Sequence, residues 1–141
     1  MADPIPADCA SVPAAPPPSL ISYTHWIYAL HAASALMGVL TGATVIGQFV
    51  FGIPSIIAVV MNYVKRDEAR GTWLESHFSW QLRTFWFALL AFLAIGLFSL
   101  PLVLLLGLGI ITWMLGAFVV GIWIVYRVAR GWLRLKDGKA V

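Results

Sequence analysis

Two long runs without an Asp, Glu, Lys or Arg residue dominate the hydrophobic pattern of this chain. The stretch Trp26–Val64 contains none of these residues, and neither does Thr84–Tyr126. Each is too long for a single membrane crossing of about 20 residues, and each fits two short crossings joined by a turn. The pattern therefore predicts four apolar helices, which we place at Thr24–Leu40, Phe49–Val64, Thr84–Leu106 and Ile110–Arg127.

The turns inside the two runs are predicted from small and polar residues. Thr41–Gln48, which includes two glycines, separates the first two helices. Between the third and fourth helices, Pro101 and the Gly107–Leu108–Gly109 step are rival turn positions, and we favour the glycines.

The only dense charge cluster in the interior of the chain is Lys65–Gly71. After it, apolar residues recur with polar residues between them, unlike in the uninterrupted apolar runs. Thr72 and Glu75 have the spacing of a capping box, in which each side chain satisfies a free backbone N–H at a helix start. Leu74, Phe78 and Leu82 then recur at helical spacing. This pattern predicts an amphipathic helix, Trp73–Arg83, that lies on the membrane surface and leads into the third span.

Composition supports a membrane protein over a soluble one. Apolar residues make up 61% of the 141 residues and charged residues 11%, with a mean hydropathy of +0.90. A soluble domain of this length could not bury so much apolar surface. The predicted fold is an all-α membrane protein of four transmembrane helices in two hairpins, with the cytoplasmic amphipathic helix before the third span.

The positive residues predict the orientation of the spans. All nine Lys and Arg residues lie either after the second span or at the C-terminus. An even number of crossings separates these two clusters, so both lie on one side, which should be the cytoplasm because positive flanks resist translocation. Such clusters beside apolar spans favour contact with anionic lipid and give no basic face for nucleic acid. We expect a multi-pass bacterial inner-membrane protein with both termini cytoplasmic.

The chain divides into three predicted regions. Residues 1–22 are rich in proline and should form a disordered cytoplasmic tail. Residues 23–130 form the four-helix transmembrane domain, and residues 131–141 form a basic cytoplasmic tail.

Four segments carry a resemblance to a known group of proteins: Asn62–Phe78, Gln81–Trp86, Tyr126–Trp132 and Asp137–Lys139. Residues 24–139 resemble a family of small, uncharacterised inner-membrane proteins of proteobacteria. That family is distantly similar to a superfamily of four-helix proteins that includes the chloroplast inner-envelope import component. The resemblance implies a four-helix architecture and no particular activity, because fold analogy says little about function.

Chemically reactive groups are scarce in the predicted spans. Ionisable residues inside a membrane usually indicate transport or proton relay; no Asp, Glu, Lys or Arg lies between the ends of these spans, and His31 is the only candidate. His25 and His31 point to different faces of one helix, so they cannot form a metal or haem pair. No nucleophilic triad, phosphate loop or carboxylate pair occurs. We therefore expect no enzyme activity and no cofactor, and we expect His31 to be neutral and bonded to a neighbouring helix.

Two features predict contacts. Ser34, Gly38 and Gly42 recur every four residues, which favours close helix packing, either inside the bundle or between copies of the chain. Tryptophans gather beside the positive clusters, as an aromatic belt or as a surface for anionic lipid or a partner. The candidate contact residues are Lys65, Arg66, Arg70, Trp73, Trp80, Arg83, Arg127, Arg130, Trp132 and Arg134.

These features favour a non-enzymatic accessory or scaffold protein. It would present its basic, tryptophan-rich cytoplasmic face to a membrane-protein partner or to anionic lipid. The alternative is a small transport or channel component that acts as a homo-oligomer.

Overall fold

Four helices make up the part of the chain that the computed structural model describes, namely residues 14–41, 45–105 and 107–141, without the side chains of 45–51 and 104. The helices are α1 (Pro18–Leu40), α2 (Val45–Ala69), α3 (Leu74–Leu104) and α4 (Leu108–Lys136). Within these ranges the only β pairing is a single bridge between Ala14 and Thr72. The prediction of an all-helical chain is confirmed.

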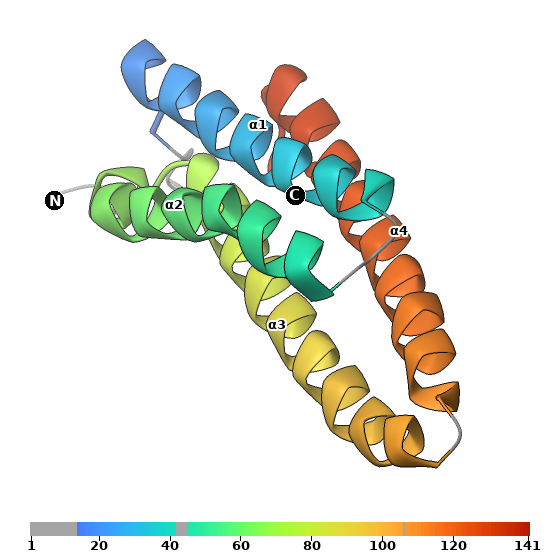
Figure 1. The fold of residues 1–141 in the computed structure, drawn as a ribbon. Coiled ribbons are helices and arrows are strands. Elements are labelled where there is room, and N and C mark those ends of the chain that lie inside the picture. The colour runs from blue at the N-terminus through green and yellow to red at the C-terminus, as the bar shows by residue number, and fades with distance from the viewer. Residues whose placement is uncertain (1–13, 42–44, 106) are drawn as a thin grey trace, which may run out of the picture.

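The helices form two hairpins that pack side by side. α1 packs on α2 and α3 packs on α4, while contacts of α1 with α4 and of α2 with α3 join the hairpins. Figure 1 shows that the α3–α4 hairpin projects well past the α1–α2 hairpin. We call the projecting part, residues 97–115, the hairpin tip. The opposite end of the bundle, where residues 65–77 and 127–141 meet, is called the basic end.

Two of the described helices are long and apolar enough to cross a membrane: α3 over Leu74–Val103 and α4 over Leu108–Lys136. Each contains an 18-residue stretch with a mean hydropathy of 2.3. Large apolar side chains at the hairpin tip are exposed, for example Leu97 at 74% and Phe98 at 70%. These helices indicate a membrane-associated protein.

The predicted surface helix is not a separate element, and this prediction is corrected by the structure. α3 runs without a break from Leu74 through Arg83 into the predicted third span. Leu74, Phe78 and Leu82 are buried in the protein core instead of facing outward. No glycine or proline interrupts the helix before Gly96, so nothing in the backbone favours a bend at the predicted junction.

The predicted boundaries of the two tails also differ from the structure. α1 begins at Pro18, with Pro17 at the N-cap position. Proline suits the first position of a helix because its ring fixes φ near the helical value and because the N–H it lacks would have no partner there. Leu20 is buried in the core, and the Ala14 amide donates to the Gly71 carbonyl at 3.2 Å. Residues 14–22 are therefore part of the folded unit. Residues 1–13 lie outside the described part of the chain.

At the other end, α4 continues through the predicted boundary at residue 131 to Lys136. Val128, Gly131 and Leu135 are buried on one face of this helix at a spacing of three and four residues. The packing of this buried face stabilises the helix through residues 131–136, which were predicted to belong to the basic tail.

The preferred turn between the third and fourth helices is confirmed. α3 ends at Leu104, and Gly107 precedes α4 with a φ of 72°, a conformation that glycine adopts without strain. Pro101 lies inside α3. The first turn is shorter than predicted, because α2 already begins at Val45. Of its predicted residues, 42–44 lie outside the described part of the chain.

Candidate functional site at the basic end

Both basic clusters lie at the same end of the bundle, as predicted from the even number of helices between them. The imidazole of His77, at the start of α3, lies between Tyr28 of α1 and the C-terminal segment. His77 Nε2 bonds the Lys139 carbonyl at 2.8 Å, and because a carbonyl only accepts, Nε2 must donate. In the neutral ring, Nδ1 then accepts the Tyr28 hydroxyl at 2.9 Å.

Close packing supports this network. A Cβ atom at Gly131 would lie only 2.5 Å from the Tyr28 hydroxyl oxygen, so glycine is what lets Tyr28 rest against α4. Tyr28 and His77 are 1% and 0% exposed. The interpretation of His77 as a residue of a surface helix is therefore wrong, because it is a buried residue that connects three segments.

A second set of polar side chains lies deeper in the bundle. Asn62 Nδ2 donates to Gln81 Oε1 at 2.6 Å, which joins α2 to α3. His31 Nδ1 bonds Ser55 Oγ at 3.1 Å, which joins α1 to α2. The prediction that His31 is packed and bonded to a neighbouring helix is confirmed.

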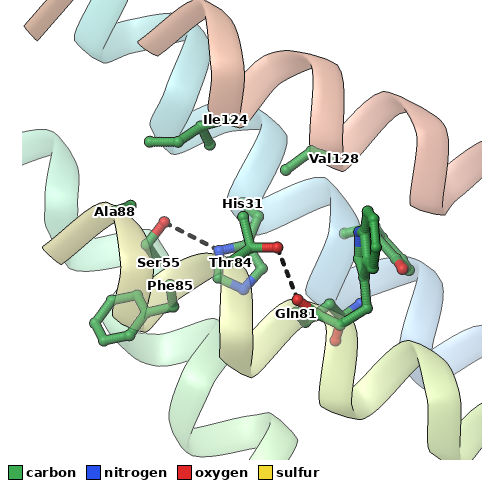
Figure 2. Close-up of a pocket in the computed structure, with 10 residues that line it drawn as sticks. His31, Ser55, Gln81, Thr84, Phe85, Ala88, Ile124 and Val128 are labelled. Atoms are coloured by element: carbon green, nitrogen blue, oxygen red, sulfur yellow. Dashed lines mark hydrogen bonds between the residues drawn. The ribbon is translucent and has the colours of Figure 1, made fainter. Parts of the chain in front are cut away.

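A small cavity of about 50 Å³ lies beside these side chains. Figure 2 shows its walls converging from all four helices, with His31 from α1, Ser55 from α2, Gln81 and Thr84 from α3, and Ile124 from α4. Two polar atoms of its wall residues, His31 Nε2 and Gln81 Nε2, are buried without a hydrogen-bond partner. Buried polar atoms without partners are costly, so this cavity favours a polar guest.

A larger groove of about 480 Å³ adjoins the small cavity. The two share Ser55, Phe85, Ala88 and Ile124 as wall residues. Apart from Ser34, Ser55 and the indole N–H of Trp113, the described side chains that line the groove are apolar. Ser34 and Gly38, predicted as packing residues, are both buried and both line this groove inside the bundle. Gly42, the third residue of that motif, lies outside the described part of the chain.

The first basic cluster is partly neutralised by its own acids. Lys65 pairs with Glu68, and Arg70 pairs with Asp67 at 3.2 Å. These are the only ion pairs among the described residues. Arg66 is exposed.

The predicted capping box does not form at the start of α3: the N-cap position is Trp73, without a side-chain cap bond, and Thr72 and Glu75 each bond an amide one residue before the one that the box predicts. The Thr72 hydroxyl accepts from the Leu74 amide at 3.2 Å. Glu75 Oε2 accepts from the Gly71 amide at 3.0 Å, one residue before the amide that the capping box predicts. Glu75 therefore has a structural role at the junction of α2 and α3.

The second basic cluster is built around Arg127. Its Nε donates to Thr84 Oγ1 at 2.9 Å, and its guanidinium carbon lies 3.7 Å from the centre of the Trp80 ring. Trp80 Nε1 in turn donates to the Arg127 carbonyl at 3.2 Å. Such a cation over an aromatic face is attracted by the ring. The charged neighbours that act on Arg127 are Arg83 and Arg130, which have the same sign.

The remaining predicted contact residues divide into two groups. Trp73 and Trp132 are half-buried and help to join segments, because Trp73 lies edge-on to His77 and Trp132 Nε1 donates to His25 at 2.9 Å. Arg130 and Arg134 are exposed; they donate to the Tyr126 hydroxyl and the Ala140 carbonyl. The structure thus brings Trp80, Arg83, Arg127 and Arg130 together and keeps the Lys65–Arg70 cluster at the α2–α3 junction.

Sequence reasoning missed the inward-facing polar residues of α3. His77, Gln81, Thr84 and Ala88 recur at three- and four-residue spacing, which is the periodicity of one helix face. Polar residues inside membrane bundles usually face the interior, and this spacing could have identified them.

The described residues contain no group of three or more His, Cys, Asp and Glu side chains arranged to hold a metal ion. No protein-family model, curated protein or solved structure matches the chain.

Proposed function

We propose that this chain is a non-enzymatic accessory protein of the bacterial inner membrane that crosses the bilayer four times and binds anionic phospholipid at its basic end. Membership in the family of small four-helix inner-membrane proteins is part of this proposal. The basic end would face the cytoplasm, with both chain termini on that side.

The lengths and surfaces of α1 and α2 support two further spans beside α3 and α4. At 1.5 Å per residue, the 23 residues of α1 and 25 residues of α2 extend about 35 Å and 38 Å, and a bilayer core is about 30 Å thick. Both helices also expose large apolar side chains, which lipid would cover. These include Leu36, Met37 and Leu40 on α1, and Ile53, Ile56, Ile57, Val60 and Val64 on α2.

The observation that carries the lipid-binding proposal is the cluster of three arginines, Arg83, Arg127 and Arg130, without a carboxylate among their ion-pair partners in the described structure. Like charges that converge without a counter-charge repel one another, so an anion that joins them is favoured. Trp80 and Trp123 flank Arg127, and tryptophan is enriched at the depth of lipid headgroups. A phosphate at this depth is the anion that a membrane supplies.

The test compares the two basic clusters in the purified chain. We expect the triple variant Arg83→Gln/Arg127→Gln/Arg130→Gln to lose more bound phosphatidylglycerol than Lys65→Gln/Arg66→Gln/Arg70→Gln. Each positive residue near anionic lipid contributes about 1 kcal/mol, and the loop cluster is already offset by Asp67 and Glu68. Native mass spectrometry of the lipid-bound species measures the difference.

Phosphatidylcholine is the control lipid, because it carries no net charge and should be retained equally by all variants. The double variant Arg83→Gln/Arg130→Gln leaves the Arg127 contacts with Thr84 and Trp80 intact and should show an intermediate loss of phosphatidylglycerol. Equal retention by both triple variants and the wild type would contradict lipid binding. A protein partner would then be the better explanation for the basic end.

A further inference from the structure

The small cavity and the groove together have the shape of a site for a long molecule with a polar head and an apolar tail. Polar wall residues gather at the small cavity, and the groove that continues from it is apolar. Ser55, Phe85, Ala88 and Ile124 line both spaces, so the groove begins where the small cavity ends. Among the described residues, no Asp, Glu, Lys or Arg lines either space.

The two unpartnered atoms at the polar end can both act as hydrogen-bond donors. Gln81 uses its oxygen to accept from Asn62, so its unpartnered atom is the amide nitrogen, which only donates. When the Ser55 hydroxyl donates to His31 Nδ1, the proton of the neutral ring lies on Nε2, which then donates as well. His31 and Gln81 are only 7% and 3% exposed. Both atoms belong to residues that line the small cavity, and an acceptor that enters it could satisfy them.

The walls also favour a flat ring. Phe85 lies where the two spaces meet, and Phe92 and Trp113 continue the aromatic lining along the groove, with ring centres 6.2 Å apart. Leu89 and Ile53 provide apolar contact for a hydrocarbon chain. The groove volume of about 480 Å³ lies within the range of roughly 300–1,000 Å³ typical of small-molecule sites.

We propose that these two spaces bind an isoprenoid quinone. Its carbonyl oxygens accept from His31 and Gln81, its ring lies against Phe85, and its isoprenoid tail follows the groove. A fatty acid fits less well, because its carboxylate would be buried without a cation. A phospholipid headgroup is excluded from the small cavity for the same reason. This site is separate from the arginine cluster and does not depend on lipid binding there.

Gly52 offers a way to close the groove without disturbing the fold. It lines the groove, and a Cβ atom there would meet no atom within 4 Å. Gly52→Leu should therefore fill the groove while leaving thermal stability at or above the wild-type value, since leucine favours a helix more than glycine. Ala94→Leu adds similar bulk to the exposed surface of α3 and is the matched control.

The experiment titrates decylubiquinone into the purified full chain in detergent and follows quenching of tryptophan fluorescence. We expect saturable quenching for the wild type and for Ala94→Leu. Affinity should fall at least about tenfold for Gly52→Leu and about tenfold for His31→Leu and for Gln81→Met, because each polar variant loses one hydrogen bond to the head. Melting curves of each variant verify that the fold is retained.

Dioleoylglycerol, which carries ester carbonyls but no quinone ring, distinguishes a quinone from a lipid ester. We expect it to displace decylubiquinone poorly. Displacement as efficient as that by a second quinone would overturn the quinone assignment. Non-saturable quenching, or equal quenching of the Gly52→Leu and Ala94→Leu variants, would overturn the site itself.

Discussion

The basic end of the bundle and the tip of the α3–α4 hairpin are held together by different interactions. At the basic end and in the adjoining part of the bundle, hydrogen bonds such as Tyr28–His77 and Asn62–Gln81 connect three helices through buried polar side chains. At the tip only two helices meet, and small residues bring their backbones close. A Cβ atom at Gly109 would overlap the Ser99 carbonyl and the Val103 backbone.

In the membrane arrangement proposed above, the surroundings of the helices account for this difference. Lipid is as apolar as a leucine side chain, so apolar contact alone does not drive helices together in a membrane. The tip therefore depends on van der Waals contact at glycines. The basic end can use directional bonds, because its polar side chains are turned inward and away from the apolar surroundings.

The largest effect should come from Gly131→Leu at the basic end. The new side chain would collide with Tyr28, push α1 away from α4 and break the bond to His77. Overpacking of this kind costs typically about 1–3 kcal/mol, and we expect the upper end because three elements meet there. Thermal unfolding in detergent measures the loss. Ala129→Leu, on the exposed side of α4, is the control and should melt like the wild type.

Gly109→Leu at the hairpin tip should cost less, about 1–2 kcal/mol, because two helices bordered by lipid can separate locally and relieve the collision. The double variant Gly109→Leu/Gly131→Leu sharpens the comparison. The two positions lie far apart on α4, so their effects should add to within about 0.5 kcal/mol. A clearly non-additive melting temperature would contradict the independence of the two regions.

The smallest effect should come from Asn62→Leu, which removes the donor to Gln81 Oε1. We expect a loss of about 1 kcal/mol, because interhelical bonds in membrane proteins contribute modestly. Asn62→Leu/Gln81→Met removes both partners, including the two unpartnered atoms Asn62 Oδ1 and Gln81 Nε2. The double variant should therefore be more stable than Asn62→Leu alone. Equal or lower stability in the same melting assay would contradict a role for this pair in holding α2 to α3.

Much of the helical framework follows from the sequence because charged residues and glycines mark the ends of the helices. The charge-free runs predict the four helices, and Gly107 predicts the turn at the tip. The two positive clusters predict that the ends of α2 and α4 meet. These signals depend on single residues and their order, so they can be identified without knowing which helix faces pack together.

The candidate site was harder to predict. An amphipathic helix usually turns its apolar face inward and its polar face outward, and a helix in lipid does the reverse. Polar residues such as His77 and Gln81 face the interior, and apolar residues such as Leu93 and Leu97 are exposed. Applying the rule for surface helices to residues 73–83 placed the polar face outward. The contacts that bury His77 also come from Tyr28 and Lys139, which are 49 and 62 residues away in the chain. No local pattern reports such distant partners.

The projection of the α3–α4 hairpin gives the molecule an unequal cross-section. Val39, next to the last residue of α1, packs at Gly121, and α4 extends thirteen residues further back to Leu108. At 1.5 Å per residue, about 20 Å of this hairpin lies beyond the end of α1 (Figure 1). The molecule is therefore four helices wide at the basic end and only two helices wide at the hairpin tip. We expect such a wedge to be accommodated with the least strain where the membrane curves around its narrow side.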